Sequence, residues 1–535
     1  MTKSARCSVP VLFLAFLLFA SAAAAATFTV TSLADSGAGS LRQAVLDANA
    51  AAGADDVAFA PGLTGTISLT SGEIAISDPL TVNGPGLEVL TLDANGLSRI
   101  FIVENTVAAL PIDVTLSGMT ITRGGRLGLS GMPLPYGGAV FSHGENLTIE
   151  DSVVSDSTVT SVGLPAQRNC GGNVALLGLG GANGGALRIV NSLLSGGRTE
   201  SSGAGGNLCV ELGTLHLERS TLSGGNCGLG FGGGGGLSLL MPENASSIVL
   251  STITGNGGTY IGGGIYADLS PGGSLTIESS TISINSAGTF GNGGGLSILG
   301  GEVRIENSTV SENNAAFGGG IGSRVGNDLQ IVNSTISGNF SYQSGGAIHF
   351  SGAEGGSLDL LHSTIFANRS LGGGAGVVVL GPPADSVRID HSILANNGED
   401  LSVFDVPVTA NYSLIQTPGI TSLVGAHNLT GIDPQLGPLA NNGGPTKTHK
   451  PLLGSPVISV GDPSIPDPPA TDQRGFPRIV GPAIDLGAVE VERESVEVPT
   501  LSDLGLAALC LLILSVGVLR MRRGGAPVKG YGRGI

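Results

Sequence analysis

The sequence predicts an all-β chain that folds into a parallel β-helix, and two observations lead to this prediction. The first is a phrase of the form apolar-x-apolar-x-x-Ser-Thr-Ile/Val-Ser, which stands most clearly at residues 275–283, 303–311 and 329–337. The second is the period, because the serine at the sixth position of the phrase returns every 26 to 31 residues. The serines in this register are Ser192, Ser220, Ser251, Ser280, Ser308, Ser334, Ser363 and Ser392. A fixed period of this length is typical of a solenoid.

Each repeat reads as two or three short strands joined by turns, with no helical spacing of its apolar residues. Strand alternation places Leu275, Ile277 and Ile282 inside the coil, and it places Thr276 and Glu278 outside. Neighbouring coils should stack about 4.8 Å apart. A β-sandwich or a propeller is the alternative, but the unit is shorter than a propeller blade and its serine register is too regular for a sandwich.

The corners of the coils account for the abundance of Gly, which contributes 90 residues, because tight turns need a positive φ or a close backbone approach. An asparagine follows the phrase in several repeats, as Asn285, Asn313, Asn339 and Asn368. Asn tolerates the left-handed conformation, and stacked Asn side chains can hydrogen-bond to the next coil. We therefore expect an asparagine ladder at one corner.

The composition limits the kind of partner. The 535 residues carry a formal charge of −17, and residues 27–501 hold 17 basic and 40 acidic residues, a charge of −23. This charge disfavours nucleic acid and anionic membrane surfaces as partners. Trp is absent and aromatic residues make up 4%, so a stacking platform for sugars or bases is poorly supplied.

Residues 1–26 read as a secretory signal peptide. Lys3 and Arg6 precede the apolar stretch from Val9 to Ala20, and small residues follow from Ala22 to Ala26. A transmembrane helix is the alternative, but the run is short and ends in alanines. Three cysteines remain in the body of the exported chain: Cys170, Cys209 and Cys227. They allow one disulfide in a loop or none, and their spacing fits no metal motif.

The N-terminal region 27–64 is expected to cover one end of the rod. Residues 39–49 read as a helix with Ser40 as N-cap, Gln43 completing a capping box, and Gly53 as the stop signal. Leu41, Ala44, Val45 and Ala48 would form its buried face. Residues 35–44 resemble the Ser-Leu-Arg-Glu/Gln-Ala domain that opens many bacterial right-handed β-helix surface proteins. The resemblance implies a capping module and a right-handed helix for the repeats at 65–410.

Proline becomes frequent after residue 410, and the repeated phrase stops. Residues 433–446, 454–456, 471–478 and 485–490 resemble, in order, the motifs of the choice-of-anchor Q domain. The resemblance implies that 411–491 forms a cap at the other end of the rod, ahead of a surface-anchoring tail. Asp472, Arg474 and Asp485 could be catalytic, but we interpret them as turn-forming, ion-paired residues of the cap.

A linker at 492–497 leads to a candidate sorting signal at 498–523 and a cytoplasmic tail at 524–535. An apolar run from Leu504 to Leu519 is expected to form a transmembrane helix. The motif residues are Val498, Pro499, Thr500, Leu501, Gly505, Arg520, Arg522 and Arg523. They resemble the Ile-Pro-Thr-Leu type of C-terminal sorting signal. The resemblance implies an exosortase-like processing enzyme as partner, transit through the inner membrane of a Gram-negative bacterium, and a final place at the cell surface or outside. A plain single-pass anchor is the alternative, because Val498 replaces Ile and Leu504 replaces the usual Trp.

One outward column could carry chemistry. The position two before the repeat serine holds Glu150, Glu218, Glu278, Glu306 and Asp390. Glu278 and Glu306 should lie on consecutive coils, with Arg304 on the same face, where the two carboxylates could bind Ca²⁺ or act as a catalytic pair. Because Val190, Val249, Val332 and Leu361 interrupt the column, we interpret it as a solvated face without cofactor.

These observations predict an exported, surface-anchored rod with a non-catalytic role in adhesion, matrix or envelope structure. Its ligand would be a surface polysaccharide or a host or matrix molecule, held by loops of unequal length such as 163–185. The alternative is a polysaccharide lyase or glycoside hydrolase that acts on an acidic polysaccharide, with Glu278, Arg304 and Glu306 as its candidate catalytic residues.

Overall fold

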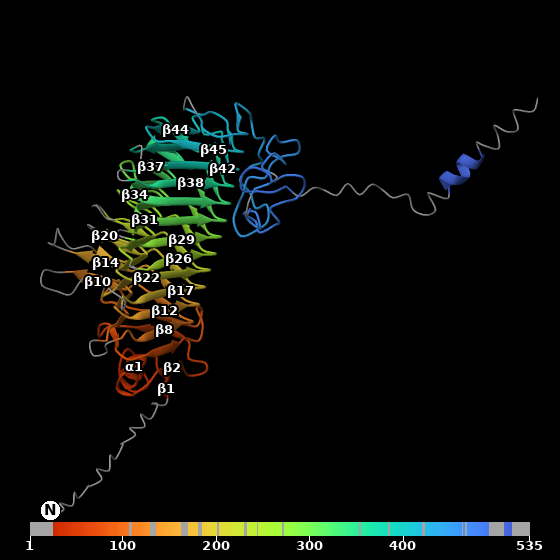
Figure 1. Cartoon of the computed structure of the whole chain (residues 1–535). Helices are drawn as coiled ribbons and strands as arrows, with labels where there is room; N and C mark the ends of the chain where they lie inside the picture. The colour runs from red at the N-terminus through yellow and green to blue at the C-terminus, as the bar shows by residue number, and fades with distance from the viewer. Residues whose placement is uncertain are drawn as a thin grey trace, which may run out of the picture. The chain divides into compact units, whose positions relative to one another are not determined.

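The computed structural model describes residues 25–491 and 508–515, apart from short gaps in the first range. The gaps are 106–109, 129–134, 162–168, 180–183, 201–202, 229–232, 243, 270–271, 353–354, 383–385, 420–422, 463 and 466–467. Residues 1–491 form one compact unit and residues 492–535 a second, and each is described by itself. The first unit is a stack of coils whose strands run across the rod in parallel layers (Figure 1).

Each coil places strands on three faces, and the strands on each face pair in parallel with those of the next coil, so the predicted parallel β-helix is confirmed. Face 1 consists of β1 (Thr27–Val30), β2 (Asp55–Phe59), β5 (Leu80–Asn83), β8 (Asp113–Ser117), β12 (Asn146–Glu150), β17 (Ala186–Val190), β22 (Thr214–Glu218), β26 (Ala245–Val249), β29 (Ser274–Glu278), β38 (Ser357–Leu361), β42 (Ser386–Asp390) and β45 (Val408–Asn411). Face 2 consists of β4 (Ile74–Ile76), β7 (Phe101–Val103), β11 (Val140–His143), β16 (Val174–Leu177), β21 (Leu208–Glu211), β25 (Leu237–Leu240), β28 (Ile265–Asp268), β37 (Ile348–Ser351), β41 (Val377–Leu380) and β44 (Leu401–Phe404). The long strands β31 (Leu296–Glu306) and β34 (Ile321–Val332) run through both faces and join them into one sheet.

Face 3 is a separate sheet, and short strands fill the corner between it and the next coil. Face 3 consists of β3 (Gly65–Ser68), β6 (Leu90–Asp93), β9 (Thr120–Thr122), β13 (Val153–Ser155), β18 (Leu193–Ser195), β23 (Thr221–Ser223), β27 (Thr252–Thr254), β30 (Thr281–Ser283), β32 (Thr309–Ser311), β35 (Thr335–Ser337), β39 (Thr364–Phe366), β43 (Ile393–Ala395), β46 (Leu414–Ile415) and β47 (Leu429–Thr430). The corner strands are β10 (Gly125–Gly128), β14 (Thr158–Ser161), β15 (Asn169–Cys170), β19 (Arg198–Thr199), β20 (Gly203–Ala204), β24 (Asn226–Cys227), β33 (Asn314–Phe317), β36 (Phe340–Ser344) and β40 (Arg369–Ser370). Parallel pairing therefore begins before residue 65 and continues past residue 410.

The repeated serine forms a ladder inside the rod, which explains why it recurs. The backbone N–H of Ser280 donates to the hydroxyl of Ser308 at 3.0 Å, and the N–H of Ser308 donates to the hydroxyl of Ser334 at 3.1 Å. Each hydroxyl in turn donates to a carbonyl two residues earlier in its own coil, at 2.7 Å for Ser308. All three serines are 1% exposed, so each hydroxyl satisfies backbone groups that water does not reach. Leu275, Ile277 and Ile282 are buried beside this ladder, as predicted.

The asparagine ladder is also present, and its hydrogen bonds between coils confirm that part of the prediction. The side-chain amide of Asn285 donates to the side-chain oxygen of Asn313 at 3.0 Å, and Asn313 donates to Asn339 at 3.0 Å. The expectation that these asparagines adopt the left-handed conformation is wrong. The residue just before each of them has the positive φ, 58° at Ile284 and 57° at Glu312. The turn therefore comes one residue earlier, and each ladder Asn keeps both side-chain polar atoms directed along the stack.

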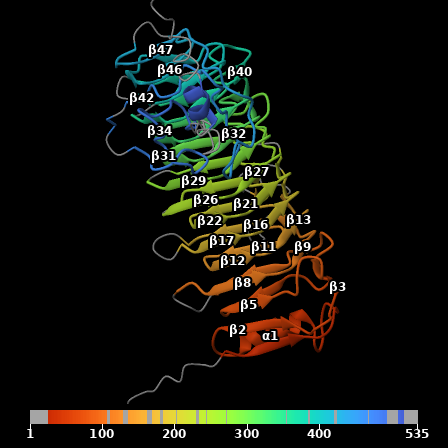
Figure 2. The same cartoon turned by 90° about the vertical axis from the view of Figure 1, so that its right-hand side faces the viewer.

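The predicted N-terminal helix is α1 (Leu41–Ala50), and its buried residues are the four expected ones. It packs against β1, β2 and β4 at the N-terminal end of the stack, and Figure 2 shows it beside β2. The Ser40 hydroxyl accepts the N–H of Gln43 at 3.2 Å, but the Gln43 side chain donates to Asp47 and leaves the capping box half formed. The helix ends at Ala50, and its C-cap is Ala51 rather than the predicted stop signal Gly53.

Residues 433–491 do not cover the end of the rod as the sequence led us to expect. They lie along face 3, beside the last coils (Figure 1). The hydroxyl of Thr309 donates to the carbonyl of Lys447 at 2.6 Å, and the backbone N–H of Ala488 donates to the hydroxyl of Thr364 at 3.0 Å. The outward hydroxyls of face 3 thus bind this flank segment, a name we keep for residues 433–491.

Residues 508–515 are helical, and the part of the chain that the structure describes contains no helix long and apolar enough to cross a membrane. The expected span from Leu504 to Leu519 is described only over these eight residues. The signal peptide up to residue 24 and the motif residues of the sorting signal lie outside the described ranges.

Cys170 and Cys209 form a disulfide with a Cα–Cα distance of 5.4 Å, which decides between the two alternatives left open by the sequence. Cys227 is a free, buried thiol in β24. Its S–H donates to the carbonyls of Gly233 and Gly234, both at 3.2 Å.

Candidate functional site

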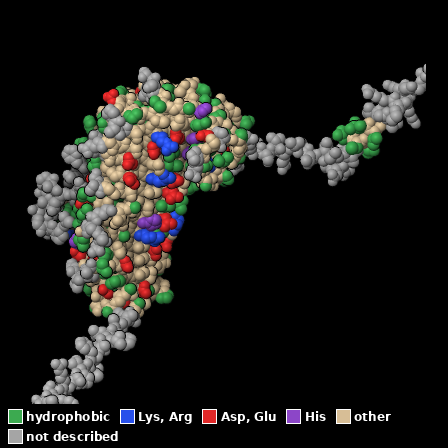
Figure 3. Space-filling view, in the orientation of Figure 1, with side chains coloured by type: hydrophobic (Ala, Val, Ile, Leu, Met, Phe, Trp, Pro, Cys, Tyr) green, Lys and Arg blue, Asp and Glu red, His purple; other side chains and the backbone are tan. Residues whose placement is uncertain are grey.

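The outward side chains of face 1 form columns because strand pairing keeps the register from coil to coil. Glu278 pairs with Glu306, and Thr276 pairs with Arg304. Charged residues gather in two of these columns and run along the rod as a stripe of basic, acidic and imidazole side chains (Figure 3). We use the name charged stripe for Arg219 of an adjoining turn and for these members of the two columns: Arg188, His216, Glu218, Glu278, Arg304, Glu306, Arg388 and Asp390.

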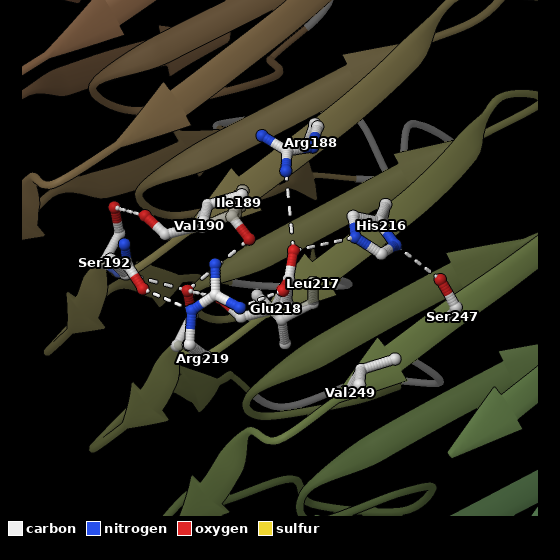
Figure 4. A network of polar contacts seen from close by, with 12 residues as sticks. Arg188, Ile189, Val190, Ser192, His216, Leu217, Glu218, Arg219, Ser247 and Val249 are labelled. Carbon is white, nitrogen blue, oxygen red and sulfur yellow. Dashed lines mark hydrogen bonds and ion pairs between the residues drawn. The ribbon is translucent and has the colours of Figure 1, made fainter. Parts of the chain in front are cut away.

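Glu218 is the centre of the first cluster in the stripe (Figure 4). Its carboxylate pairs with Arg188 at 3.4 Å, with His216 at 3.3 Å, and with Arg219 of the adjoining turn. The hydrogen bond with His216 is the main cause that lowers the pKa of Glu218. The other ring nitrogen of His216 lies 2.7 Å from the hydroxyl of Ser247 in the next coil. This carboxylate is fully engaged, so it is a poor candidate for proton transfer.

The structure brings together the three residues that the sequence singled out, but it does not make them equivalent. Arg304 donates through Nε to Glu306 at 2.8 Å, and it also hydrogen-bonds to Gln330 on the following coil. Glu278 is exposed, and its carboxylate makes no hydrogen bond or ion pair with any residue that the structure describes. Glu306 is therefore held by a cation, while its neighbour Glu278 faces water alone.

Arg388 and Asp390 repeat the Arg304–Glu306 arrangement farther along the stripe. Arg388 donates through Nε to one oxygen of Asp390 at 2.7 Å, and a terminal nitrogen of Arg388 lies 2.6 Å from the same oxygen. Asn411, on the next coil, donates to the other oxygen of Asp390 at 3.1 Å. Asp390 is 9% exposed, so its charge is satisfied mainly by these partners.

Between these two ion pairs lies a cavity of about 570 Å³, which we call the stripe cavity. Val332 and Leu361, the apolar interruptions of the carboxylate column, form its floor. Asp462, Ile465 and Pro469 of the flank segment form the opposite wall. The volume is within the range of about 300–1,000 Å³ that is common for small-ligand sites.

A stack of rings closes the side of the stripe cavity. His362 and His391 lie with ring centroids 4.9 Å apart, and Tyr412 follows His391 at 5.3 Å. Burial lowers the pKa of His362 to about 2 and that of His391 to about 4, so both rings are neutral at pH 7. Nε2 of His391 accepts the backbone N–H of Asp462 at 3.0 Å, which joins the flank segment to face 1.

These rings and the flank wall are the part of the site that the sequence reasoning missed. His362, His391 and Tyr412 each occupy the left-handed position just before a ladder serine, with φ of 50°, 50° and 44°. The repeat register could have placed them in one column. The opposite wall could not be found in this way, because it comes from a segment outside the repeat.

Asp472, Arg474 and Asp485 are structural, in line with our interpretation. Asp472 and Arg474 form an ion pair at 2.8 Å with side chains that are 0% and 3% exposed. Asp485 accepts the backbone N–H groups of Ser459 and Val491 at 2.6 and 2.7 Å. These contacts hold turns of the flank segment, and both Asp472 and Asp485 are buried.

The described residues offer little for a metal ion. They contain no group of three or more His, Cys, Asp or Glu side chains placed to hold one. Ca²⁺ takes six to eight oxygen ligands in proteins. Glu278 and Glu306 provide two carboxylates, one of which is already bound to Arg304, so this pair alone does not fit a resident calcium ion.

No family model matches the chain, and no curated protein sequence matches it significantly. Among solved structures, the chain resembles the crystal structure of pectate lyase Pel9A, with 15% sequence identity and a TM-score of 0.32. The likeness covers 88% of this chain and 97% of that one. A likeness of this degree carries no conclusion about activity.

Proposed function

We propose that this protein is an exported β-helical rod that is displayed at the surface of a Gram-negative bacterium and acts by binding, without catalysis. Its role would be adhesion, or contact with matrix or envelope components. The observation that carries the proposal is the pairing of charges along face 1. Glu218, Glu306 and Asp390 are each bound to at least one arginine.

This pairing argues against acid–base chemistry because catalytic carboxylate pairs need one member whose environment keeps it ready to release or accept a proton. Here the carboxylates engage guanidinium groups rather than one another. The same pairs give the face a fixed pattern of donors and acceptors along the rod. A regular, pre-organised pattern of this kind suits recognition of an extended ligand.

The resemblances support the export and anchoring part of the proposal. Residues 1–26 would direct secretion, the region around α1 would be the N-terminal module of bacterial surface β-helices, and 411–491 would be a choice-of-anchor Q domain. An exosortase-like enzyme would then process the signal at 498–523. The disulfide between Cys170 and Cys209 supports an oxidising destination, since such bonds are rare in the cytosol.

A polysaccharide lyase or hydrolase that acts on an acidic polymer is the second candidate. One observation favours it: the exposed Glu278 lies in register with Glu306 on the neighbouring coil, with Arg304 on the same face. In that case Glu278 would be the base or the acid, and Arg304 would bind a carboxylate of the substrate. A soluble Ca²⁺ ion could join Glu278 when the substrate supplies further oxygen ligands.

The deciding experiment is a binding and depolymerisation screen of the purified full chain on acidic and neutral polysaccharides, with and without Ca²⁺. Binding without cleavage is expected. Cleavage that is lost in Glu278→Gln and Glu306→Gln, but kept in Glu150→Gln of the same column, would establish the enzyme instead. Protease treatment of intact cells gives the second readout, because a displayed rod should be digested while cytoplasmic proteins are spared.

A further inference from the structure

The stripe cavity has the features of a binding site that the charged stripe alone does not have. It is bounded on two sides, by face 1 and by the flank segment, and an ion pair lies at each end. Register places Glu306 beside Val332, Val332 beside Leu361, and Leu361 beside Asp390. The two ends are therefore three coil steps apart, about 14 Å at the usual strand spacing.

The middle of the stripe cavity is apolar on both sides. Val332 and Leu361 line it from face 1, between the two ion pairs, and Ile465 and Pro469 line it from the flank segment. These are the positions where the column of carboxylates is interrupted. A ligand that lies here must therefore have an apolar surface in its middle part, because polar groups would lose water without gaining a partner.

Each end of the stripe cavity offers hydrogen-bond donors and acceptors side by side. Arg304 uses Nε and Nη1 for Glu306 and Gln330, and its Nη2 makes no hydrogen bond within the described part of the chain. Arg388 uses Nε and Nη2 for Asp390, and its Nη1 makes no hydrogen bond with a described residue. The second carboxylate oxygen of Glu306 has no described partner, so it remains an acceptor. A hydroxyl group can donate and accept at once, which suits this arrangement better than a carboxylate or an ammonium does.

The charge balance excludes a strongly anionic ligand. Two arginines line the stripe cavity, and three carboxylates accompany them, those of Glu306, Asp390 and Asp462. The two histidines are neutral because of their burial. The surrounding chain adds to the negative potential, with a charge of −23 over residues 27–501. A ligand with several carboxylates or sulfates would be repelled on approach.

We propose that the stripe cavity binds a short oligosaccharide made of uncharged sugar units. Sugar rings would lie with their C–H faces between Leu361 and Pro469, and their hydroxyls would bind the Arg304–Glu306 pair at one end and the Arg388–Asp390 pair at the other. This inference rests on the proposed binding role and names the class of ligand for it. It differs from the acidic polysaccharide that the enzyme alternative would require.

The test is a titration of the full chain with neutral di- to tetrasaccharides built from glucose, mannose, galactose or N-acetylglucosamine, and with uronic acid oligosaccharides of the same length. Binding is expected for at least one neutral series. Leu361→Ser and Arg388→Gln should each weaken it about tenfold, the effect of one lost charged hydrogen bond or one lost apolar contact. The matched controls are Val249→Ser, in the same column as Leu361 on a coil outside the stripe cavity, and Arg198→Gln, at an exposed position of the corner strand β19. They should leave the affinity unchanged.

Several results would overturn the inference, and they separate it from the proposed function. Binding of uronic acid oligosaccharides alone would show that the charge argument is wrong. Binding of neutral sugars that Val249→Ser weakens as much as Leu361→Ser would place the ligand elsewhere on face 1. Absence of binding by the folded chain would show that neutral oligosaccharides are not the ligand, without contradicting the proposed display at the surface. Cleavage of a bound sugar would overturn the non-catalytic function itself.

Discussion

The hydroxyl of Thr335 donates to the side-chain carbonyl of Gln473 at 2.6 Å, across 138 residues of sequence. The amide nitrogen of the same glutamine donates to the carbonyl of Ser308 at 3.1 Å and lies 2.9 Å from the hydroxyl of Thr309. Gln473 is 1% exposed. One side chain thus joins the flank segment to two coils of face 3.

Replacing Gln473 should loosen the flank segment without unfolding the rod. Gln473→Met keeps the length of the side chain but leaves the buried hydroxyl of Thr335 without its acceptor, so we expect a loss of about 2–4 kcal/mol in the free energy of opening. Hydrogen exchange of the Ala488 amide, which donates to Thr364, measures this opening. Gln343→Met is the control, because Gln343 is exposed on β36. Equal exchange rates in the two variants would show that the segment is held by other contacts.

The asparagine ladder should be among the most sensitive features of the rod. The side-chain oxygen of Asn313 accepts both the backbone N–H and the side-chain amide of Asn285, at 2.9 and 3.0 Å. Asn313→Ala leaves these buried donors unpaired and creates a cavity, so we expect a loss of about 3 kcal/mol or more in the free energy of unfolding. Denaturant unfolding provides the measurement. Asn226→Ala, at an exposed position in β24, should cost less than about 1 kcal/mol.

The coil was predictable because the evidence for it is local and repeated. Alternation in Leu275-Thr276-Ile277 allows one inward set, and the recurring serine fixes the register of every coil. Because this evidence is local, it could not predict where the flank segment packs. Residues 281–283 and 309–311 have nearly the same sequence, yet the first strand shows two half-buried residues and the second is fully buried.

The difference arises because residues 433–491 cover only the later coils of face 3. No pattern within a repeat reports a contact with a segment more than a hundred residues away. The candidate site divides in the same manner. Arg304 and Glu306 could be predicted from their columns, whereas Asp462 and Pro469 come from the flank segment. The stripe cavity exists only where the two meet, so the sequence could indicate the charged residues but not the enclosure.

The thiol chemistry of the chain should distinguish its three described environments. Cys170 and Cys209 are bonded, Cys227 is buried, and Cys510 is exposed. Burial raises the pKa of Cys227 to about 11, so this thiol stays protonated at pH 8 and does not react as a thiolate. Iodoacetamide at pH 8 should modify Cys510 and spare Cys227 until the protein is denatured. Peptide mass spectrometry reads both the labelling and the Cys170–Cys209 linkage.

Loss of that disulfide should lower stability. The bond closes a 39-residue segment, and Cys170→Ser with Cys209→Ser is expected to cost about 3–4 kcal/mol in the free energy of unfolding. Cys227→Ser, which changes a thiol outside the bond, is the matched single-site control. If reduction of the wild-type protein leaves its melting temperature unchanged, the bond does not form in the exported chain.

Acid should destabilise the junction between face 1 and the flank segment through its buried histidines. Burial is the main cause that holds the pKa of His391 at about 4, below its ordinary value of 6.5, and it also holds the pKa of His362 at about 2. Below pH 6.5 these histidines bind protons in the unfolded chain but not in the folded chain. Their contribution to the free energy of unfolding is therefore fully present above pH 6.5, and it falls as the pH drops toward 4. The slope approaches about 1.4 kcal/mol per pH unit for each such group.

Glu490 opposes this trend over part of the same range, so the effect must be read from a variant. Burial raises the pKa of Glu490 to about 7, so its folded form keeps a proton that the unfolded form releases, and stability gained at low pH is lost as the pH rises to 7. His362→Phe keeps the ring stack and removes one titrating group. We expect the difference in unfolding free energy between this variant and wild type to grow in favour of the variant as the pH falls from 6.5 to 4. The comparison variant is His427→Phe, at the exposed end of the stack. Parallel curves for wild type and His362→Phe would mean that His362 is not buried in its neutral form.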